Sequence, residues 1–383
     1  MHFYIPTNIY VEKNCVQHHA KDVLALGKKA LIVTGKHSAK TNGSLDDVLK
    51  ILQSGNVPYQ IFNEVEENPS VETVACAAEM GKAFGADFVI GIGGGSPIDA
   101  AKAIALLIAN PSETETSLYT PKDLKTLPLL AVPTTCGTGT EATPVSVLTN
   151  RKGGFKKSIA CKIFPTLSLV DGKYLAFAKK ELILNTAVDA LSHMVESYLN
   201  SQSNVYNRMF PEYGLKIWEQ NKNALLSDAP IDEKLYENLM LASTLAGMSI
   251  VHTSTALPHG MSYDLTYNLR VPHGKAVGYF LAAYMKACEK SVPADVRTIL
   301  DLLKLKDVAA FAEMVKAMIG TYELPRATVE CFAQRMCENS SKLKLAPCEL
   351  SKEDVWEIYR ESLIIISVRR KFSERLDPRI YAV

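Results

Sequence analysis

The sequence lacks the long apolar run that a membrane-spanning helix requires. Such a helix needs roughly 20 consecutive apolar residues, and the densest apolar stretch here, residues 363–368, is far shorter. The N-terminal segment MHFYIPTNIY has no basic start followed by a long apolar block, so it does not resemble a secretory signal. We therefore expect no membrane partner.

An excess of charge of either sign is also absent. The 383 residues include 42 Lys and Arg against 41 Asp and Glu, which gives a formal charge of +1. Proteins that grip nucleic acid or anionic membranes need a strong basic excess, so we expect no nucleic-acid partner. The length predicts about two globular domains.

Paired cysteine motifs are missing as well. The eight cysteines are scattered along the chain, and none forms a CxxC pair. A chain of this length buries enough surface to fold without disulfide staples. We therefore expect reduced, mostly buried thiols and a cytoplasmic protein.

The first half of the sequence alternates short β-branched runs with longer helical patterns. Helices are expected at 45–53 and 71–84, and strands at 30–33, 59–62, 88–92 and 129–132, with a further strand or hairpin within 3–11. Strands that alternate with helices predict βαβ units, and hence a parallel, Rossmann-like sheet with helices on both faces.

From about residue 175 the candidate strands disappear and long helical periods follow. Helices are expected at 181–199, 211–226, 232–251, 273–288, 308–319, 328–338 and 352–362, with prolines between several of them. The fold class is therefore α/β plus all-α: an α/β domain over residues 1–178 and a helical bundle domain over 179–383.

A glycine-rich turn joins the strand at 88–92 to a helix. Gly93, Gly94 and Gly95 are followed by Ser96, a good helix N-cap, and Pro97, which suits a first helical turn. Glycines let a backbone approach a pyrophosphate closely, and a helix start favours its negative charge. The pattern is neither GxxxxGK[ST] nor a clean GxGxxG, so a ligand-free turn is the alternative.

A second polar loop, PTTCGTGTE at 133–141, follows the next strand. It offers threonine hydroxyls and two glycines. Two such loops at strand ends suit the crevice where open α/β sheets bind nucleotides. An ordinary polar loop is the alternative.

A third group of residues could ligate a metal. Asp189 and His193 are spaced i, i+4, which places both on one helix face, and the tripeptide PHG occurs twice, with His259 and His273. One carboxylate and up to three imidazoles suit a divalent first-row metal. Each histidine alone is more simply a hydrogen-bonded core residue. His252 is a fifth candidate, while the histidines at 2, 18, 19 and 37 are expected at the surface.

Taken together, these motifs resemble the iron-containing (group III) alcohol dehydrogenase family over nearly the whole chain. The pieces occur in that family's order: Asn68-Pro69-Ser70, GGGSPIDAAK at 93–102, PTTCGTGTE at 133–141, VDALSHMVE at 188–196, and the two PHG tripeptides. The resemblance implies a nucleotide-binding domain, a helical domain that binds metal and substrate, and an active site in the cleft between them.

The resemblance also implies roles for individual residues. Asp189, His193, His259 and His273 would hold one divalent metal, usually Fe²⁺ with Zn²⁺ as an alternative. NADP(H) or NAD(H) would be bound by a larger set: Gly94, Gly95, Ser96, Asp99, Thr134, Thr135, Thr138, Asn68 and Lys157. The metal would polarise the oxygen of a small aldehyde or primary alcohol while the nicotinamide carries the hydride.

Two positions depart from the family pattern near the expected active site. Tyr263 stands where many members carry a second histidine discussed as a proton relay, and His252 stands where many carry asparagine. Tyr263 could pass a proton or simply line the pocket. His252 could titrate near the substrate or be a packed helix residue.

A third departure concerns the choice of cofactor. NAD-preferring relatives often carry an acidic residue at the position of Gly35, where it holds the ribose 2′-hydroxyl and repels a 2′-phosphate. Glycine removes that repulsion, and Lys36, Ser38 and Lys40 are available to bind the phosphate. We expect NADPH to be accepted and preferred, with indifference between the two cofactors as the alternative.

Further alternatives concern the reaction, the substrate and the assembly. The second reaction is that of an NAD- and metal-dependent lyase or cyclase of the dehydroquinate synthase type, and the third reading is a nucleotide-binding protein without chemistry. The run Thr253–Tyr263 also resembles the branch that reduces phosphonoacetaldehyde-type aldehydes, with Arg270 and Lys275 near an anionic tail. The family resemblance implies a homodimer or higher homo-oligomer.

Overall fold

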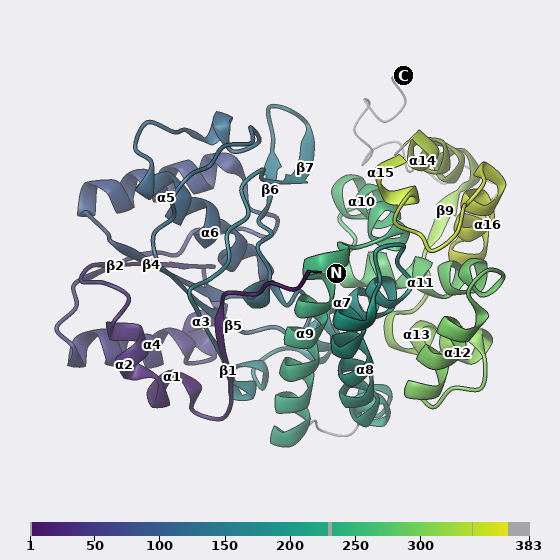
Figure 1. The fold of residues 1–383 in the computed structure, drawn as a ribbon, viewed down its shortest axis with the longest axis horizontal. Coiled ribbons are helices and arrows are strands. Elements are labelled where there is room, and N and C mark those ends of the chain that lie inside the picture. The colour runs from purple at the N-terminus through teal and green to yellow at the C-terminus, as the bar shows by residue number, and fades with distance from the viewer. Residues whose placement is uncertain (1, 229–231, 339, 367–383) are drawn as a thin grey trace. The chain divides into compact units, whose positions relative to one another are not determined.

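The computed structural model describes residues 2–228, 232–338 and 340–366. It divides into two compact units, which are described separately (Figure 1). The first comprises His2–Lys179 and Ile231–Val251, and the second takes in the described parts of Lys180–Pro230 and His252–Val383. Helix α9 (Glu233–Thr253) therefore packs almost entirely with the first unit, although it follows the domain boundary expected at residue 178.

A close backbone approach explains why α9 belongs to the first unit. Gly247 of α9 lies against Gly139 so closely that a Cβ on either glycine would overlap the backbone of the other. Beside this contact, Thr244 Oγ1 donates a hydrogen bond to the buried Glu141 carboxylate at 2.7 Å. Composition and helical period carry no signal of such a pairing between glycines distant in the sequence.

The first unit is built on a six-stranded, all-parallel sheet with the order β1-β8-β5-β4-β2-β3. The four strands predicted at 30–33, 59–62, 88–92 and 129–132 are confirmed. Its members are β1 (Asn8–Val11), β2 (Ala30–Thr34), β3 (Tyr59–Phe62), β4 (Phe88–Gly93), β5 (Leu129–Pro133) and β8 (Leu167–Val170). The N-terminal segment forms a strand parallel to β8, so the hairpin alternative is wrong. The hairpin β6 (Val147–Asn150) with β7 (Phe155–Ser158) was not predicted.

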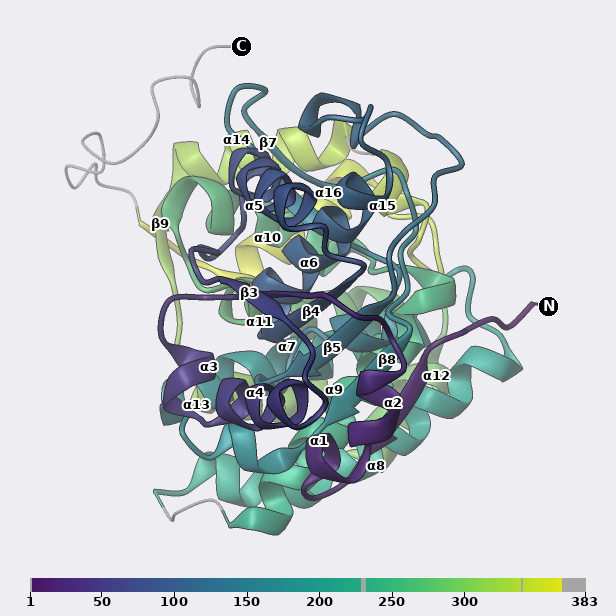
Figure 2. The ribbon, with the colours of Figure 1, turned by 90° about the vertical axis from the view of Figure 1, so that its left-hand side faces the viewer.

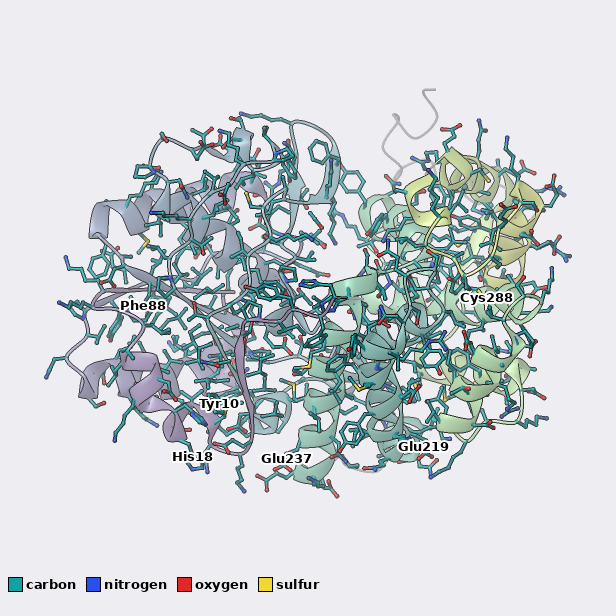
Figure 3. All side chains as sticks on the ribbon, in the orientation of Figure 1. Tyr10, His18, Phe88, Glu219, Glu237 and Cys288 are labelled. Atoms are coloured by element: carbon teal, nitrogen blue, oxygen red, sulfur yellow. The ribbon has the colours of Figure 1, made fainter. Side chains whose placement is uncertain are left out.

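Helices cover both faces of this sheet, as Figures 1 and 2 show. Leu31 and Val33 of β2 pack toward α5 (Val71–Phe84) and α6 (Gly95–Ala109). Ala30 and Ile32 pack on the opposite face, whose covering helices are α1 (Cys15–His18), α2 (Ala20–Leu24), α3 (Ser38–Thr41) and α4 (Ser44–Ser54). Figure 3 marks Phe88 of β4 within this sheet. Side chains alternate between faces along a strand, so the continuous apolar runs fill two cores.

The second unit is formed mainly by helices around α11 (His273–Glu289), which contacts α7, α10, α12, α13 and α16. Its other helices are α7 (Lys180–Tyr198), α8 (Val205–Leu226), α10 (Leu257–Leu269), α12 (Pro293–Leu302), α13 (Val308–Ile319), α14 (Arg326–Glu338), α15 (Ser340–Leu343) and α16 (Lys352–Ser362). A short parallel pair, β9 (Glu323–Pro325) with β10 (Ile364–Ile366), was not predicted. Among the described residues, no helix is long and apolar enough to cross a membrane.

Candidate functional site

The four expected metal ligands come together in the second unit. Asp189 and His193 lie one turn apart on α7, His259 lies in the first turn of α10, and His273 begins α11. Asp189 Oδ1 lies 3.9 Å from His193 Nε2, 3.7 Å from His259 Nε2 and 3.8 Å from His273 Nε2. One carboxylate oxygen therefore faces three imidazole nitrogens from three helices.

The arrangement fits a divalent cation. Asp189 Oδ1 is buried and accepts no hydrogen bond from any described residue, and His193 Nε2 lies only 3.0 Å from His259 Nε2. Ligand atoms of Asp189, His193 and His259 all lie within 4.8 Å of one another. Burial raises the pKa of Asp189, but the three imidazoles outweigh it and hold the pKa below its usual value. Carboxylate oxygen and imidazole nitrogen suit Fe²⁺ and Zn²⁺.

Glu196 fixes the orientation of one of these ligands. Its Oε1 accepts a hydrogen bond from His259 Nδ1 at 2.6 Å, and its Oε2 accepts one from the backbone N–H of Ala256 at 2.6 Å. A donor at Nδ1 leaves the Nε2 lone pair available to a metal. Burial raises the pKa of Glu196 to about 7. Sequence reasoning did not single out Glu196, although Asp189, His193 and Glu196 share one helix face at i, i+4 and i+7.

The two candidate proton donors, Tyr263 and His252, are more exposed than the expected ligand His259 and its partner Glu196. Tyr263 lies one turn after His259 on α10 and is 40% exposed, and no described residue forms a hydrogen bond or ion pair with its side chain. His252 lies at the end of α9 and is half-buried. Their roles stay predictions.

The candidate phosphate loop and the threonine loop lie side by side in the first unit. They follow β4 and β5, neighbouring parallel strands whose carboxyl ends share one edge of the sheet. Thr134 N donates to Gly93 O at 2.9 Å. A Cβ on Gly95 would lie 2.8 Å from Thr138 Cγ2, and one on Gly94 would lie 3.1 Å from the Thr135 side chain. Because Gly94 and Gly95 have no Cβ, the side chains of Thr135 and Thr138 can pack directly against their backbone.

Ser96 and Asn68 extend the same surface. Asn68 N donates to Ser96 Oγ at 3.2 Å from a backbone with positive φ. Gly94 caps α6, so the free backbone N–H groups of Gly95 and Ser96 mark the helix start. The structure therefore brings together most of the expected cofactor residues: Asn68, Gly94, Gly95, Ser96, Thr134, Thr135 and Thr138.

Asp99 uses its carboxylate in hydrogen bonds within the protein, and its expected role toward the cofactor stays a prediction. Oδ1 accepts a hydrogen bond from Thr140 Oγ1 at 2.5 Å, and Oδ2 accepts one from Val147 N at 2.9 Å. The buried Lys102 Nζ lies 3.8 Å from Asp99 and donates to carbonyl oxygens of Thr140, Thr143 and Val145. Asp99 and Lys102 together brace the threonine loop.

Lys157, expected at the cofactor, differs in its surroundings from the neighbouring Lys156. Lys157 is exposed on β7, whereas Lys156 is half-buried and its Nζ donates to Asn68 Oδ1 at 2.6 Å. Successive residues of a strand point to opposite faces, so Lys156 and Lys157 face different ways, and the role expected of Lys157 stays a prediction. Lys156 is therefore the lysine joined to Asn68, one of the residues expected to bind the cofactor.

The loop after β2 adjoins the candidate phosphate loop, because β2 pairs with β4. Gly35 opens this loop, and a Cβ there would lie 3.4 Å from Val65 O. The exposed Lys36 forms an ion pair with Glu64 at 3.1 Å, and the exposed Ser38 begins α3.

Comparison with known proteins gives one family for both units. Residues 6–172 match the iron-containing alcohol dehydrogenase family, and residues 183–363 match the C-terminal part of the Fe-containing alcohol dehydrogenase family. The chain is 32% identical over 299 residues to an NADPH-dependent butanol dehydrogenase of Clostridium saccharobutylicum, covering 76% of this chain and 75% of the relative.

Two further matches bear on structure and substrate. A solved structure of an iron-containing alcohol dehydrogenase from Thermotoga maritima is 35% identical with a TM-score of 0.86, covering 94% of this chain and 99% of that one. A sulfoacetaldehyde reductase of Bilophila wadsworthia is 30% identical over 265 residues, covering 66% of this chain and 65% of the relative.

Proposed function

As this chain belongs to the iron-containing alcohol dehydrogenase family, we propose that it works as an NADPH-dependent reductase of small aldehydes with Fe²⁺ at Asp189, His193, His259 and His273. Membership makes it a metal-dependent oxidoreductase that transfers hydride between a nicotinamide cofactor and an alcohol or aldehyde. The lyase alternative is not favoured by any of the relatives described. One observation carries the proposal: a buried carboxylate oxygen that faces three imidazole nitrogens.

The residues around Asp189 would hold the metal and fix the orientation of its ligands. A bound metal supplies a Lewis acid that polarises the substrate oxygen. Asp189 and the three histidines hold that metal, and Glu196 keeps Nε2 of His259 directed toward it through the hydrogen bond at Nδ1. Asp189, His193 and His259 are buried, and the low dielectric around them strengthens their electrostatic attraction for a cation.

The start of α6 supports binding of the cofactor pyrophosphate. Its free backbone N–H groups and helix dipole favour negative charge. Ser96 Oγ and the hydroxyls of Thr135 and Thr138 border the same turn. Lys156, joined to Asn68, adds a positive charge to this surface.

The loop after β2 supports a preference for NADPH. Gly35 places no carboxylate beside the expected ribose, so a 2′-phosphate meets no repulsion from that position. The side chain of Lys36 is more than half exposed, and it forms an ion pair with the exposed Glu64. Such a surface ion pair contributes little free energy in water. A phosphate can therefore recruit Lys36, and the NADPH-dependent relative is consistent with this choice.

An anionic aldehyde is a second candidate substrate. Lys275 lies in the first turn of α11, two residues after His273, and no described residue forms an ion pair with it. A lysine in that place could meet a sulfonate or phosphonate tail. The relative that reduces sulfoacetaldehyde favours testing such substrates.

The test is nicotinamide oxidation by the anaerobic, Fe²⁺-loaded enzyme against a panel of aldehydes. The panel contains aliphatic aldehydes, lactaldehyde, succinic semialdehyde, sulfoacetaldehyde and phosphonoacetaldehyde. We expect higher kcat/KM with NADPH than with NADH, and reversal of that preference in Gly35→Asp through a raised KM for NADPH. An unchanged cofactor ratio in Gly35→Asp would refute the role of Gly35, and no turnover of any panel aldehyde would refute the reductase assignment.

The proposal extends to the proton donor, the cellular compartment and the oligomeric state. The same assay on Tyr263→Phe and His252→Ala tests proton donation, since loss of the donor should lower kcat and change its pH profile. All eight cysteines lie in the described residues and none forms a disulfide bond there, as expected in a reducing cytoplasm. A homodimer or higher homo-oligomer is testable by light scattering.

A further inference from the structure

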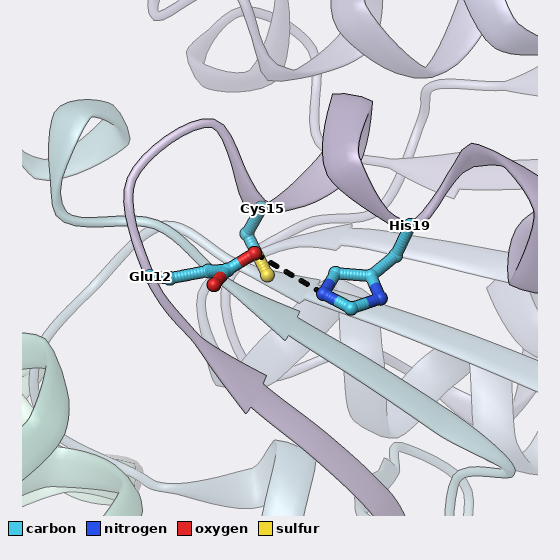
Figure 4. Close-up of side chains that lie close together, drawn as sticks. All are labelled: Glu12, Cys15 and His19. Carbon is cyan, nitrogen blue, oxygen red and sulfur yellow. Dashed lines mark hydrogen bonds and ion pairs between the residues drawn. The ribbon is translucent and has the colours of Figure 1, made fainter.

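A second cluster of potential metal ligands lies in the first unit and takes no part in the proposed reaction. Glu12, Cys15 and His19 each offer one ligand atom, and these atoms all lie within 4.8 Å of one another (Figure 4). Glu12 directly follows β1, Cys15 begins α1, and His19 separates α1 from α2. Figure 3 marks neighbouring Tyr10 and His18 in the same N-terminal segment.

We propose that Glu12, Cys15 and His19 bind a divalent transition metal of the Zn²⁺ type, which fastens the N-terminal segment and is not needed for catalysis. Thiolate, imidazole and carboxylate are the ligands that Zn²⁺ prefers. Bond lengths of about 2.0 to 2.3 Å put tetrahedral ligand atoms roughly 3.3 to 3.8 Å apart. Small side-chain movements therefore close the observed cluster around an ion.

His19 is oriented as a metal-binding imidazole would be. Its Nδ1 lies 3.0 Å from Asp22 Oδ2, and its Nε2 lies 3.1 Å from Glu12 Oε1. The ring stacks on Tyr10 at 3.5 Å between centroids. Once Nδ1–H donates to Asp22, Nε2 points a lone pair at a carboxylate oxygen, so a cation or a second proton must lie between them.

Cys15 contributes a thiol from a fixed backbone. Its N–H donates to the buried Asp171 Oδ2 at 3.3 Å, and its Sγ lies 3.5 Å from Tyr10 O. Burial raises the pKa of Cys15 to about 12, so the thiol keeps its proton until a cation stabilises the thiolate. Metal binding then releases this proton to solvent and forms the metal–sulfur bond.

His18 and water are the candidates for a fourth ligand. His18 Nδ1 lies 3.0 Å from Glu12 Oε1, the same oxygen that faces His19, and its side chain is 59% exposed. The competing interpretation is a protonated His19 that bridges Glu12 and Asp22 with no metal at all.

Cobalt substitution separates the two interpretations. The Asp189 site has no sulfur ligand, so a thiolate-to-Co²⁺ charge-transfer band reports only a cysteine site. Metal-free full-length protein is titrated with Co²⁺ under anaerobic conditions. We expect two Co²⁺ per chain and a near-ultraviolet band that persists in His259→Ala, disappears in Cys15→Ser, and is unchanged in the control Cys76→Ser, which alters an exposed cysteine on α5.

Further variants guard against loss of folding. Glu12→Gln and His19→Gln should each weaken the band, and Asp22→Asn should weaken Co²⁺ binding about tenfold, as outer-shell partners do. Cys15→Ser, loaded with Fe²⁺ at the Asp189 site, should keep the rate of aldehyde reduction. Absence of the band, its persistence in Cys15→Ser, or binding of a single Co²⁺ per wild-type chain would overturn the proposal in favour of the bridging proton.

Discussion

At the residue scale, the proposed metal site depends on how each imidazole is oriented as well as on which residues are present. The sequence identifies Asp189, His193, His259 and His273 by spacing and motif, and the structure brings them together. It does not identify Glu196 as the residue that orients His259, because a glutamate on a helix is ordinarily exposed. Only the fold shows that this carboxylate is buried and used twice.

Replacing Glu196 should therefore weaken the metal site without touching a ligand. In Glu196→Gln, the carboxylate is lost and His259 Nδ1 no longer meets a charged acceptor. We expect metal affinity to fall 10- to 100-fold, measured as Fe²⁺ retained after dialysis, with kcat lowered in proportion. Glu330→Gln, an exposed position on α14, is the control. Full metal retention in Glu196→Gln would contradict this role.

Glu66 gives a pH-dependent prediction near Asn68. Its carboxylate accepts hydrogen bonds from Ser70 N and Thr73 Oγ1 and pairs with Arg151. Burial raises its pKa, but hydrogen bonds from its own backbone, from Ser70 and from Thr73 outweigh that effect and hold the pKa below its usual value. A carboxyl group whose pKa is lower in the folded protein than in the unfolded chain stabilises the fold. This stabilisation is complete above the unfolded pKa of about 4.3, and it is lost as the pH falls through the folded-state pKa.

The corresponding experiment compares wild type with Glu66→Gln by thermal unfolding. We expect the variant to have the lower Tm at pH 7 and the difference to shrink as pH falls below about 4. Glu313→Gln, exposed on α13, should show no such convergence. A difference in Tm that stays constant down to low pH would contradict the assignment.

At the element scale, strands and helices followed from local pattern where pattern was strong. The buried strands β2, β4 and β5 and the helices α7 and α13 were predicted within a residue or two of their observed ends. Helices α10 and α12 were missed because Pro258 and Pro293 were interpreted as breakers, whereas both lie in first turns, where proline is tolerated. Strand β8 was missed because its four residues give little periodicity.

The hydrogen bonds from Lys102 that brace the threonine loop give a testable prediction. Lys102 on α6 holds the segment Thr140–Val145 by hydrogen bonds from a fully buried ammonium, although burial lowers its pKa to about 8. Lys102→Met leaves Asp99 without its partner charge and several carbonyl oxygens without a donor. We expect a loss of about 3 to 5 kcal/mol in the free energy of unfolding, from urea titration.

The same variant should raise KM for the nicotinamide cofactor, because the threonine loop borders the start of α6. Lys50→Met, on the surface of α4, is the matched control and should change the free energy of unfolding by less than about 0.5 kcal/mol. If Lys102→Met also cost less than 1 kcal/mol, the brace would not hold the loop.

At the scale of the whole molecule, the sequence predicts two kinds of architecture and assigns chemistry to each. The fold class is confirmed, and the solved relative spans 94% of the chain. The placement of α9 could not be predicted, since it depends on the contact between Gly139 and Gly247, which are distant in sequence. The proposed cofactor residues lie in one unit and the proposed metal ligands in the other, so the proposed reaction requires residues of both units.

The central claim is that hydride transfer depends on the metal held by Asp189, His193, His259 and His273. The most direct measurement follows deuterium from NADPH labelled at the transferred C4 position into the carbonyl carbon of an aldehyde, at increasing Fe²⁺ loading under anaerobic conditions. We predict that the label appears in the alcohol in proportion to Fe²⁺ bound at this site. His193→Ala and the chelated enzyme should transfer essentially none. Deuterium transfer at the wild-type rate by either metal-free enzyme would contradict the account.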